Sequence, residues 1–373
     1  MDLGRVSRAL VFTLTVALSA ACGNGSAQTV DQPQASSGLS SRSTAPLSSA
    51  RATRYPANLA LRPGATPVGD GPIGRAIAAF ESCGSDQDCF VVLERVDGSQ
   101  ATLPADIADT PVSLSPDGTW LVYLRQGTTI LRNLVTGVVQ RLASYRDPLA
   151  WSPDSRWLMF GGRSGGDFIV RDVASGTEAS HLHPSPPPGA SAEPAEPQPS
   201  GPYYVAGVTE QGRVVRYERP DTPAQVGAFA LDVLDPATMA SHPIRVALGS
   251  PQGLRPGWQS PVAPMLADTL YLQMSVNGTM TLLPVSLSTG TTGAAVTVTE
   301  PGSRHPVPFT ATLDDQGWTT VAALPGQGLV YRVKAKDADG DDLIAVDPLT
   351  GRSRNLTHTR QGWPLALAAP PSR

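Results

Sequence analysis

A tetrapeptide that returns after 37 residues constrains the fold of this chain more than any other feature. The two copies read Ser115-Pro116-Asp117-Gly118 and Ser152-Pro153-Asp154-Ser155, and each is followed, after one further residue, by a tryptophan. The apolar residues on both sides of each copy alternate with period 2, which is typical of strands packed against neighbouring sheets. An internal period near 40 residues with this alternation predicts the four-stranded blades of a β-propeller, an all-β fold.

The repeated residues suit a tight turn between the first two strands of a blade. Proline presets φ at the second turn position, aspartate can hydrogen-bond nearby backbone, and glycine tolerates the exit geometry. A second hairpin follows in each copy, with Thr136-Gly137 and Ser175-Gly176 as its turns. We therefore expect the tetrapeptides to serve packing and not chemistry.

The two copies, at about residues 111–182, resemble the PD40, or WD40-like, repeats of TolB-type propellers. Asn277-Gly278 and Thr289-Gly290 look like the turns of a more degenerate blade, and residues 343–351 end another. The resemblance implies a propeller and suggests a partner in the cell envelope. It does not indicate an activity, since such blades occur in scaffolds, in binding lipoproteins and as domains of peptidases.

Chain length bounds the number of blades. The predicted propeller, residues 55–373, suits six blades, or alternatively seven, of about 40 to 50 residues each. The expected first blade holds residues 76–80, 90–93 and 101–103. Residues 363–367 are expected to add its innermost strand, which would remove an open sheet edge.

The later blades are placed by weaker patterns. After the two clear repeats, a fourth blade is predicted to begin around Tyr203 and a fifth near Trp258. The sixth is predicted to begin at Val307. Between the third and fourth blades, residues 184–201 are rich in proline and form a predicted loop, either a tolerated surface insertion or an extended docking strip for a partner.

The N-terminus has the layout of a secretory signal peptide. Arg5 and Arg8 precede an apolar run that is too short to span a bilayer, and small residues lead into Cys22. This layout resembles a bacterial lipobox, which implies removal of residues 1–21 and acylation of Cys22. The alternative is an ordinary secreted protein with an incidental cysteine. The predicted location is the extracytoplasmic face of the bacterial cell membrane, with a lipid anchor.

Residues 22–54 are dominated by small and polar residues and hold almost no large apolar ones. Such a segment cannot bury enough apolar surface to fold by itself. It is predicted to be a flexible tether that lets the propeller stand away from the membrane.

The other two cysteines, Cys83 and Cys89, lie between two predicted strands. A disulfide across this hairpin suits an oxidising compartment, and two nearby free thiols are the alternative. Two cysteines supply too few ligands for a structural zinc site, and no histidine pair has the usual spacing. The sequence predicts neither a metal nor another cofactor.

Three short motifs are interpreted as structural. Residues 162–166 match G-x-S-x-G, but a strand follows them where a hydrolase needs a helix. An acidic cluster resembles a calcium loop without its glycine and glutamate, and is interpreted as a solvated hairpin tip. Its residues are Asp337, Asp339, Asp341 and Asp342. His181 and His183 alternate on one strand face and are interpreted as surface or packing residues. No catalytic residue is predicted.

Two function classes follow from these patterns. A net charge of −4 without a basic cluster argues against nucleic acid. The first class is a monomeric, non-catalytic module that binds an envelope protein, a peptide or a glycan. The second is an extracytoplasmic hydrolase or lactonase with acidic residues around a metal in the central channel. Carboxylates or histidines directed into one end of the channel would favour the enzyme.

Overall fold

The computed structural model divides the chain into residues 1–49 and residues 50–373. It describes residues 54–370 except 84–88, 105–106, 108–111, 143–147, 162–167, 182–202, 219–227, 248–254, 257–263, 310–317, 336–339 and 360–363. The predicted signal peptide, Cys22, nearly all of the tether and the proline-rich loop lie outside the described residues.

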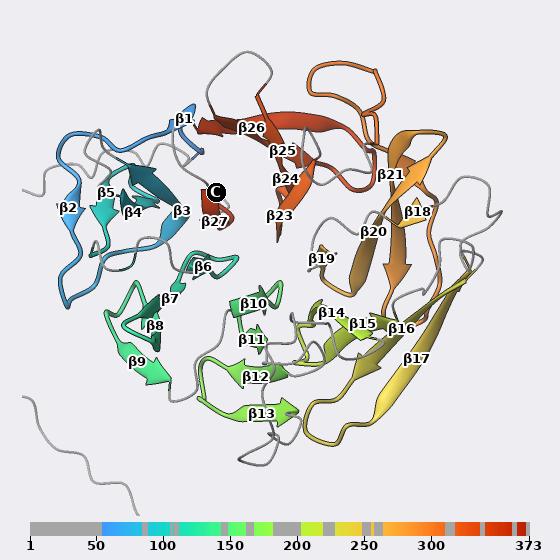
Figure 1. The fold of residues 1–373 in the computed structure, drawn as a ribbon, viewed down its shortest axis with the longest axis horizontal. Coiled ribbons are helices and arrows are strands. Elements are labelled where there is room, and N and C mark those ends of the chain that lie inside the picture. The colour runs from blue at the N-terminus through green and yellow to red at the C-terminus, as the bar shows by residue number, and fades with distance from the viewer. Residues whose placement is uncertain are drawn as a thin grey trace, which may run out of the picture. The chain divides into compact units, whose positions relative to one another are not determined.

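Six sheets surround a common centre in the second unit (Figure 1). Neighbouring strands are antiparallel, apart from two short parallel pairs at the outer edges. No α-helix occurs in the described part of the chain, so it contains no helix that could cross a membrane. The protein is a six-bladed β-propeller, which confirms the predicted fold and the preferred blade number.

The blades follow one another along the chain, and each is built outward from the strand nearest the centre. Blade one contains β27 (Pro364–Leu367), β3 (Ala76–Cys83), β4 (Cys89–Arg95), β5 (Gln100–Thr102) and β2 (Thr66–Pro67). Blade two contains β6 (Val112–Leu114), β7 (Trp120–Arg125), β8 (Thr128–Asn133) and β9 (Val139–Leu142). Blade three contains β10 (Pro148–Trp151), β11 (Trp157–Gly161), β12 (Phe168–Asp172) and β13 (Glu178–His181).

The second half of the ring repeats this order. Blade four contains β14 (Tyr203–Val208), β15 (Val214–Glu218), β16 (Ala228–Leu234) and β17 (Ser241–Ala247). Blade five contains β18 (Arg255–Pro256) and β19 (Met265–Leu266), which both pair with β20 (Thr269–Val276), and then β21 (Thr279–Ser286) and β22 (Val296–Thr297). Blade six contains β23 (Thr319–Leu324), β24 (Gly328–Lys334), β25 (Asp341–Val346), β26 (Ser353–Thr359) and β1 (Asn58–Leu59).

The two ends of the propeller exchange strands between the last blade and the first. As predicted, the C-terminal strand β27 is innermost in blade one, where Leu367 pairs with Ala78 of β3. The N-terminal strand β1 lies parallel to β26 at the outer edge of blade six. The hydroxyl of buried Tyr55 donates to the carbonyl of Ala368, so the two end segments also contact each other directly. This exchange closes the ring and covers two sheet edges.

The apolar core consists of six clusters, one between each pair of neighbouring blades. Leu93 and Leu121 meet between blades one and two, and Val122 and Leu158 meet between blades two and three. Leu121 and Val122 are adjacent in β7 but serve different clusters, because successive strand residues point to opposite faces. Both faces of a blade are therefore apolar, and each blade is stabilised by its two neighbours.

One predicted blade boundary is wrong. Val307 does not begin blade six: its carbonyl accepts the Met280 amide at 2.8 Å, and its own amide donates to Val298 at 2.9 Å. These bonds place Val307 at the edge of blade five, and blade six starts with β23. The predicted start of blade four, around Tyr203, is confirmed by β14. The chain enters blade five at β18, shortly before Trp258, which lies outside the described residues.

Candidate functional site

The two repeated tetrapeptides make the same hydrogen bonds. The Ser115 hydroxyl accepts the Trp120 amide at 2.9 Å and donates to Asp117 at 2.6 Å. The Ser152 hydroxyl likewise accepts the Trp157 amide, at 2.8 Å. Both serines are fully buried. Their side chains close the turn between the first two strands of the blade, as the turn chemistry predicts.

These turns also join neighbouring blades. Gly118 has a φ of 71°, and a Cβ built on it would lie 2.0 Å from the carbonyl oxygen of Ala76 in blade one. Only glycine fits so close to another backbone. One blade further on, Ser155 occupies the equivalent position, and its hydroxyl accepts the amide of Asp117 at 2.9 Å. The tetrapeptides therefore stabilise both the turn and the blade contact.

A second repeated turn closes the outer hairpin of several blades, and sequence analysis recognised only part of it. An Asn or Asp side chain accepts hydrogen bonds from the backbone amides of the second and third residues after it. The fourth residue after it has a positive φ. The Asn or Asp residues concerned are Asn133, Asp172 and Asp235. Asp347 begins an equivalent turn, where the Leu349 amide and Thr350 lower the pKa of its carboxyl. These carboxylates stabilise turns and are not arranged for catalysis.

Two members of the predicted acidic cluster lie in a strand and not at a hairpin tip. Asp341 and Asp342 belong to β25, where Asp342 lies 2.8 Å from Nδ1 of His358. Asp341 lies 3.8 Å from Nε of Arg332. The interpretation as a solvated tip is wrong for these two residues, because both pair with β24 and β26 inside the sheet. Asp337 and Asp339 lie outside the described residues.

The remaining motif residues do not form a catalytic group in the described part of the chain. The ring of His181 packs on Phe168 at a centroid distance of 5.7 Å, while His183 and residues 162–166 lie outside the described residues. Cys83 and Cys89 are joined by a disulfide across the β3–β4 hairpin. Glu81 lies close to both sulfurs, but disulfide sulfurs do not provide thiolate ligands for a metal.

The innermost strands allow a test for channel catalysis. The strands nearest the centre are β27, β6, β10, β14, β19 and β23, one from each blade (Figure 1). These strands contain no aspartate, glutamate or histidine.

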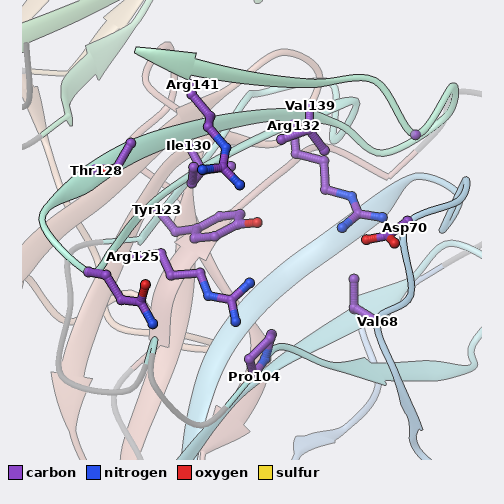
Figure 2. A pocket seen from close by; sticks show the side chains of 12 residues that line it. Val68, Asp70, Pro104, Tyr123, Arg125, Thr128, Ile130, Arg132, Val139 and Arg141 are labelled. Atoms are coloured by element: carbon purple, nitrogen blue, oxygen red, sulfur yellow. The ribbon is translucent and has the colours of Figure 1, made fainter. Parts of the chain in front are cut away.

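A pocket of about 780 Å³ lies between blades one and two. One wall is the face of blade two that is directed toward blade one, and Figure 2 shows Tyr123 at its centre with Arg125, Arg132 and Arg141 around it. Val68, Asp70 and Pro104 of blade one form the opposite side (Figure 2).

The strand register explains why three arginines meet there. Tyr123 in β7 pairs with Ile130 in β8, and Ile130 pairs with Arg141 in β9. Arg125 and Arg132 are each two residues from this row along their own strands, so all these side chains share one face of the blade. Each arginine comes from a different strand. The sheet therefore gathers three positive charges that are scattered in the sequence.

Arg132 is the buried member of this group, with only 4% of its surface exposed. Its guanidinium donates to the carbonyls of Gly69 and Gly71, the latter at 2.7 Å, which fixes the neighbouring segment of blade one. Its Nε is buried and has no hydrogen-bond partner. Arg132 makes no ion pair within the described part of the chain, although Asp70 also lines the pocket (Figure 2). Among the residues that line the pocket, three are arginines and one is an aspartate, in a protein of negative net charge.

Sequence analysis missed this pocket because its arginines are isolated in the chain. A signal existed in the alignment of the two repeats. Arg132 aligns with Arg171, but the residue opposite Arg132 on the next strand is Val139, whereas Glu178 is opposite Arg171. Arg132 therefore has no carboxylate opposite it, although the aligned arginine of blade three has one, and this difference is the sequence signal that points to the pocket.

No family model matches this sequence, and no curated protein matches it. Among solved structures, TolB from Acinetobacter baumannii is 13% identical with a TM-score of 0.44, over 77% of this chain and 64% of that chain. The chain thus spans less than two thirds of that TolB. A putative TolB from Agrobacterium tumefaciens is 15% identical with a TM-score of 0.39, over 80% of this chain and 95% of that one.

An oligogalacturonate lyase in complex with manganese is 16% identical with a TM-score of 0.38, over 77% of this chain and 74% of that one. The six sheets around one centre and the repeated turns of blades two and three establish the fold of this chain as a six-bladed β-propeller.

Proposed function

We propose that the protein is a lipid-anchored, extracytoplasmic binding module whose propeller holds an envelope protein, peptide or glycan without catalysing a reaction. The observation that carries this proposal is a contrast between two surfaces. The innermost strands contain no aspartate, glutamate or histidine, whereas an open, positively charged pocket lies between blades one and two. Such a distribution suits recognition at the side of the ring.

The proposed location rests on the chain before the propeller. Residues 1–21 resemble a signal peptide, and Cys22 stands where a bacterial lipoprotein carries its lipid. The disulfide between Cys83 and Cys89 suits the oxidising compartment that such a signal leads to. A tether ending near Arg54 would allow the propeller to meet partners at some distance from the membrane.

The anchor is tested by replacing Cys22. We expect Cys22→Ala to move the protein from the membrane fraction to the soluble extracytoplasmic fraction, because a stable anchor needs the acyl chains. The matched control is Cys83→Ser with Cys89→Ser, which removes two other cysteines and should leave the protein with the membranes. A Cys22→Ala protein that still sediments with membranes contradicts the proposed anchor.

Binding is tested by cross-linking the tagged full-length protein in its native membranes, followed by mass spectrometry. We expect a reproducible cross-linked partner that is lost with Cys22→Ala and kept with the Cys83→Ser, Cys89→Ser control. Purified protein is assayed in parallel for hydrolysis of lactone and glycan substrates with and without divalent metal. Turnover that survives further purification contradicts the non-catalytic proposal.

A further inference from the structure

We propose that the pocket between blades one and two is a binding site for an acidic saccharide, with Arg132 and Arg141 facing its carboxylate. This inference rests on the proposed binding function and names its ligand class. Guanidinium groups form paired hydrogen bonds with carboxylates, so arginine suits such recognition. The side chain of Arg141 makes no hydrogen bond or ion pair within the described residues, and its guanidinium is directed into the pocket (Figure 2).

The comparison with blade three indicates that the positive charge is not a requirement of the fold. Arg171 has the position of Arg132 and also reaches toward the preceding blade, where it donates to Gln140 at 2.7 Å. Glu178, opposite Arg171, forms an ion pair with it. In blade two Val139 takes the place of this glutamate, and the nearest carboxylate to Arg132 among the pocket-lining residues is that of Asp70 in blade one (Figure 2). The strand position that neutralises Arg171 in blade three is therefore uncharged in blade two.

The Arg132 side chain is held in place by blade one. Its guanidinium donates to two backbone carbonyls there, and its Nε is buried without a partner, as is Nε of Arg171 in blade three. Because the side chain also holds the carbonyls of Gly69 and Gly71, its position is set before a ligand arrives.

The other lining groups favour a saccharide over a simple anion. Asp70 would repel a ligand that carried only negative charge, but it can accept hydrogen bonds from sugar hydroxyls. The hydroxyl of Thr128 can donate to such a ligand or accept from it. Ile130 and Val139 provide apolar surface for the C–H groups of a ring. A volume of about 780 Å³ is within the range of small-ligand sites and can hold a disaccharide.

The test measures binding by isothermal titration calorimetry on the full-length protein purified in detergent. Three probes are compared: a β-1,4-linked disaccharide of glucuronic acid, cellobiose as its neutral analogue, and a tetraglutamate peptide. We expect the acidic disaccharide to bind at least about tenfold more tightly than either other probe, and less tightly as salt is raised. Equal or tighter binding of cellobiose overturns the role of charge, and preferred binding of tetraglutamate overturns the saccharide class.

The variants make blade two resemble blade three. Val139→Glu places the carboxylate of Glu178 opposite Arg132, and Arg141→Ser introduces the residue found at position 180. Each is expected to weaken binding of the acidic disaccharide about tenfold or more. Both positions are exposed, so the melting temperature should change little. Glu178→Val is the matched control in blade three and should leave the affinity unchanged.

Failure of this inference can be told apart from failure of the proposed function. If Val139→Glu and Arg141→Ser melt normally and bind the disaccharide as the unchanged protein does, the pocket is not the site. If no probe binds, the acidic-saccharide inference is wrong, even when cross-linking finds a membrane-dependent protein partner. Release by Cys22→Ala is measured without any of these probes, so it reports on the anchor alone.

Discussion

Blade three is built from one continuous stretch of chain, residues 148–181, whereas blade one combines residues 66–102 with residues 364–367. In blade three, the Ser152 turn joins the innermost strand to the next one. In blade one, no such turn is possible, because β27 and β3 are far apart in sequence. The chain after β27 instead makes two backbone hydrogen bonds. The Ala368 amide donates to the carbonyl of Ile77 at 2.9 Å, and the Ala369 amide donates to the carbonyl of Pro116 in blade two at 2.6 Å.

The difference separates two sources of stability in one fold. Blade three depends on local turns that form between residues close in sequence, while the junction of blades six and one depends on contacts between the two ends of the chain. The hydrogen bond from Tyr55 to Ala368 spans 313 residues. Distant contacts cost more chain entropy to form than local ones do. Changes at the junction should therefore affect the ring as a whole.

Removal of β27 is expected to have the largest effect. Deleting residues 364–373 exposes an edge of β3 and takes Leu367 and Ala368 out of the core. We expect the cooperative thermal unfolding transition to be lost and the protein to aggregate on size-exclusion chromatography. Deleting only residues 371–373 is the control and should preserve the transition. A normal transition in the longer deletion would mean that blade one does not need its C-terminal strand.

Gly118→Ala should have the next largest effect, because the added Cβ would lie 2.0 Å from the carbonyl oxygen of Ala76. The positive φ of Gly118 adds a cost for any side chain. We expect a loss of about 2 kcal/mol or more in the free energy of unfolding, measured with denaturant. The matched change in blade three, Ser155→Gly, should cost less than about 1.5 kcal/mol, because it relieves positive φ while losing one hydrogen bond. Similar costs at both positions would contradict the close approach.

Tyr55→Phe should have a moderate effect at the same junction. The variant keeps the buried ring but removes the hydrogen bond to Ala368, which leaves that carbonyl without this donor. We expect a loss of about 1 to 2 kcal/mol in the free energy of unfolding. Burial raises the pKa of Tyr55, so the phenol stays neutral and the effect should be the same at pH 6 and pH 9. An unchanged free energy would show that the end segments do not depend on this bond.

The smallest expected effect concerns the pH dependence of blade three. Burial alone would raise the pKa of Asp172, but hydrogen bonds from Ser175, Arg156 and Ala174 outweigh it and hold that pKa below its usual range. The carboxylate therefore adds stability above about pH 4, and this stability is lost as the pH falls through the folded-state pKa. The melting temperature of Asp172→Asn should be lower than that of the unchanged protein at pH 7, and the difference in melting temperature should be smaller at pH 3. The same difference at both pH values would contradict the lowered pKa.

Much of this architecture could be predicted from the sequence because its local turns carry recognisable residues. The repeated Ser-Pro-Asp turns identified blades two and three, and the apolar C-terminal segment identified the closing strand. The strands β1 and β2 were not predicted, since two residues are too few to show alternation. The turn at Asp235 was also missed, because Met239 stands where the other copies have glycine.

The candidate pocket could not be predicted in the same way. Its three arginines belong to three strands, and their meeting depends on the register of the whole sheet. The opposing residues, such as Val68 and Asp70, belong to another blade. Patterns within a short window report turns and strand faces, but they do not report which faces meet across a blade contact.

The strand exchange at the ends of the propeller also has a consequence for synthesis. A chain emerging from the ribosome presents the partner strands of blade one early, but β27, which completes this blade, is made after all the other described strands of the propeller. A prematurely terminated product can form the local turns of blades two and three and still has an open ring. Such a product exposes an unpaired edge for quality-control proteases and chaperones to recognise. The fold thus distinguishes finished chains from unfinished ones at a single junction.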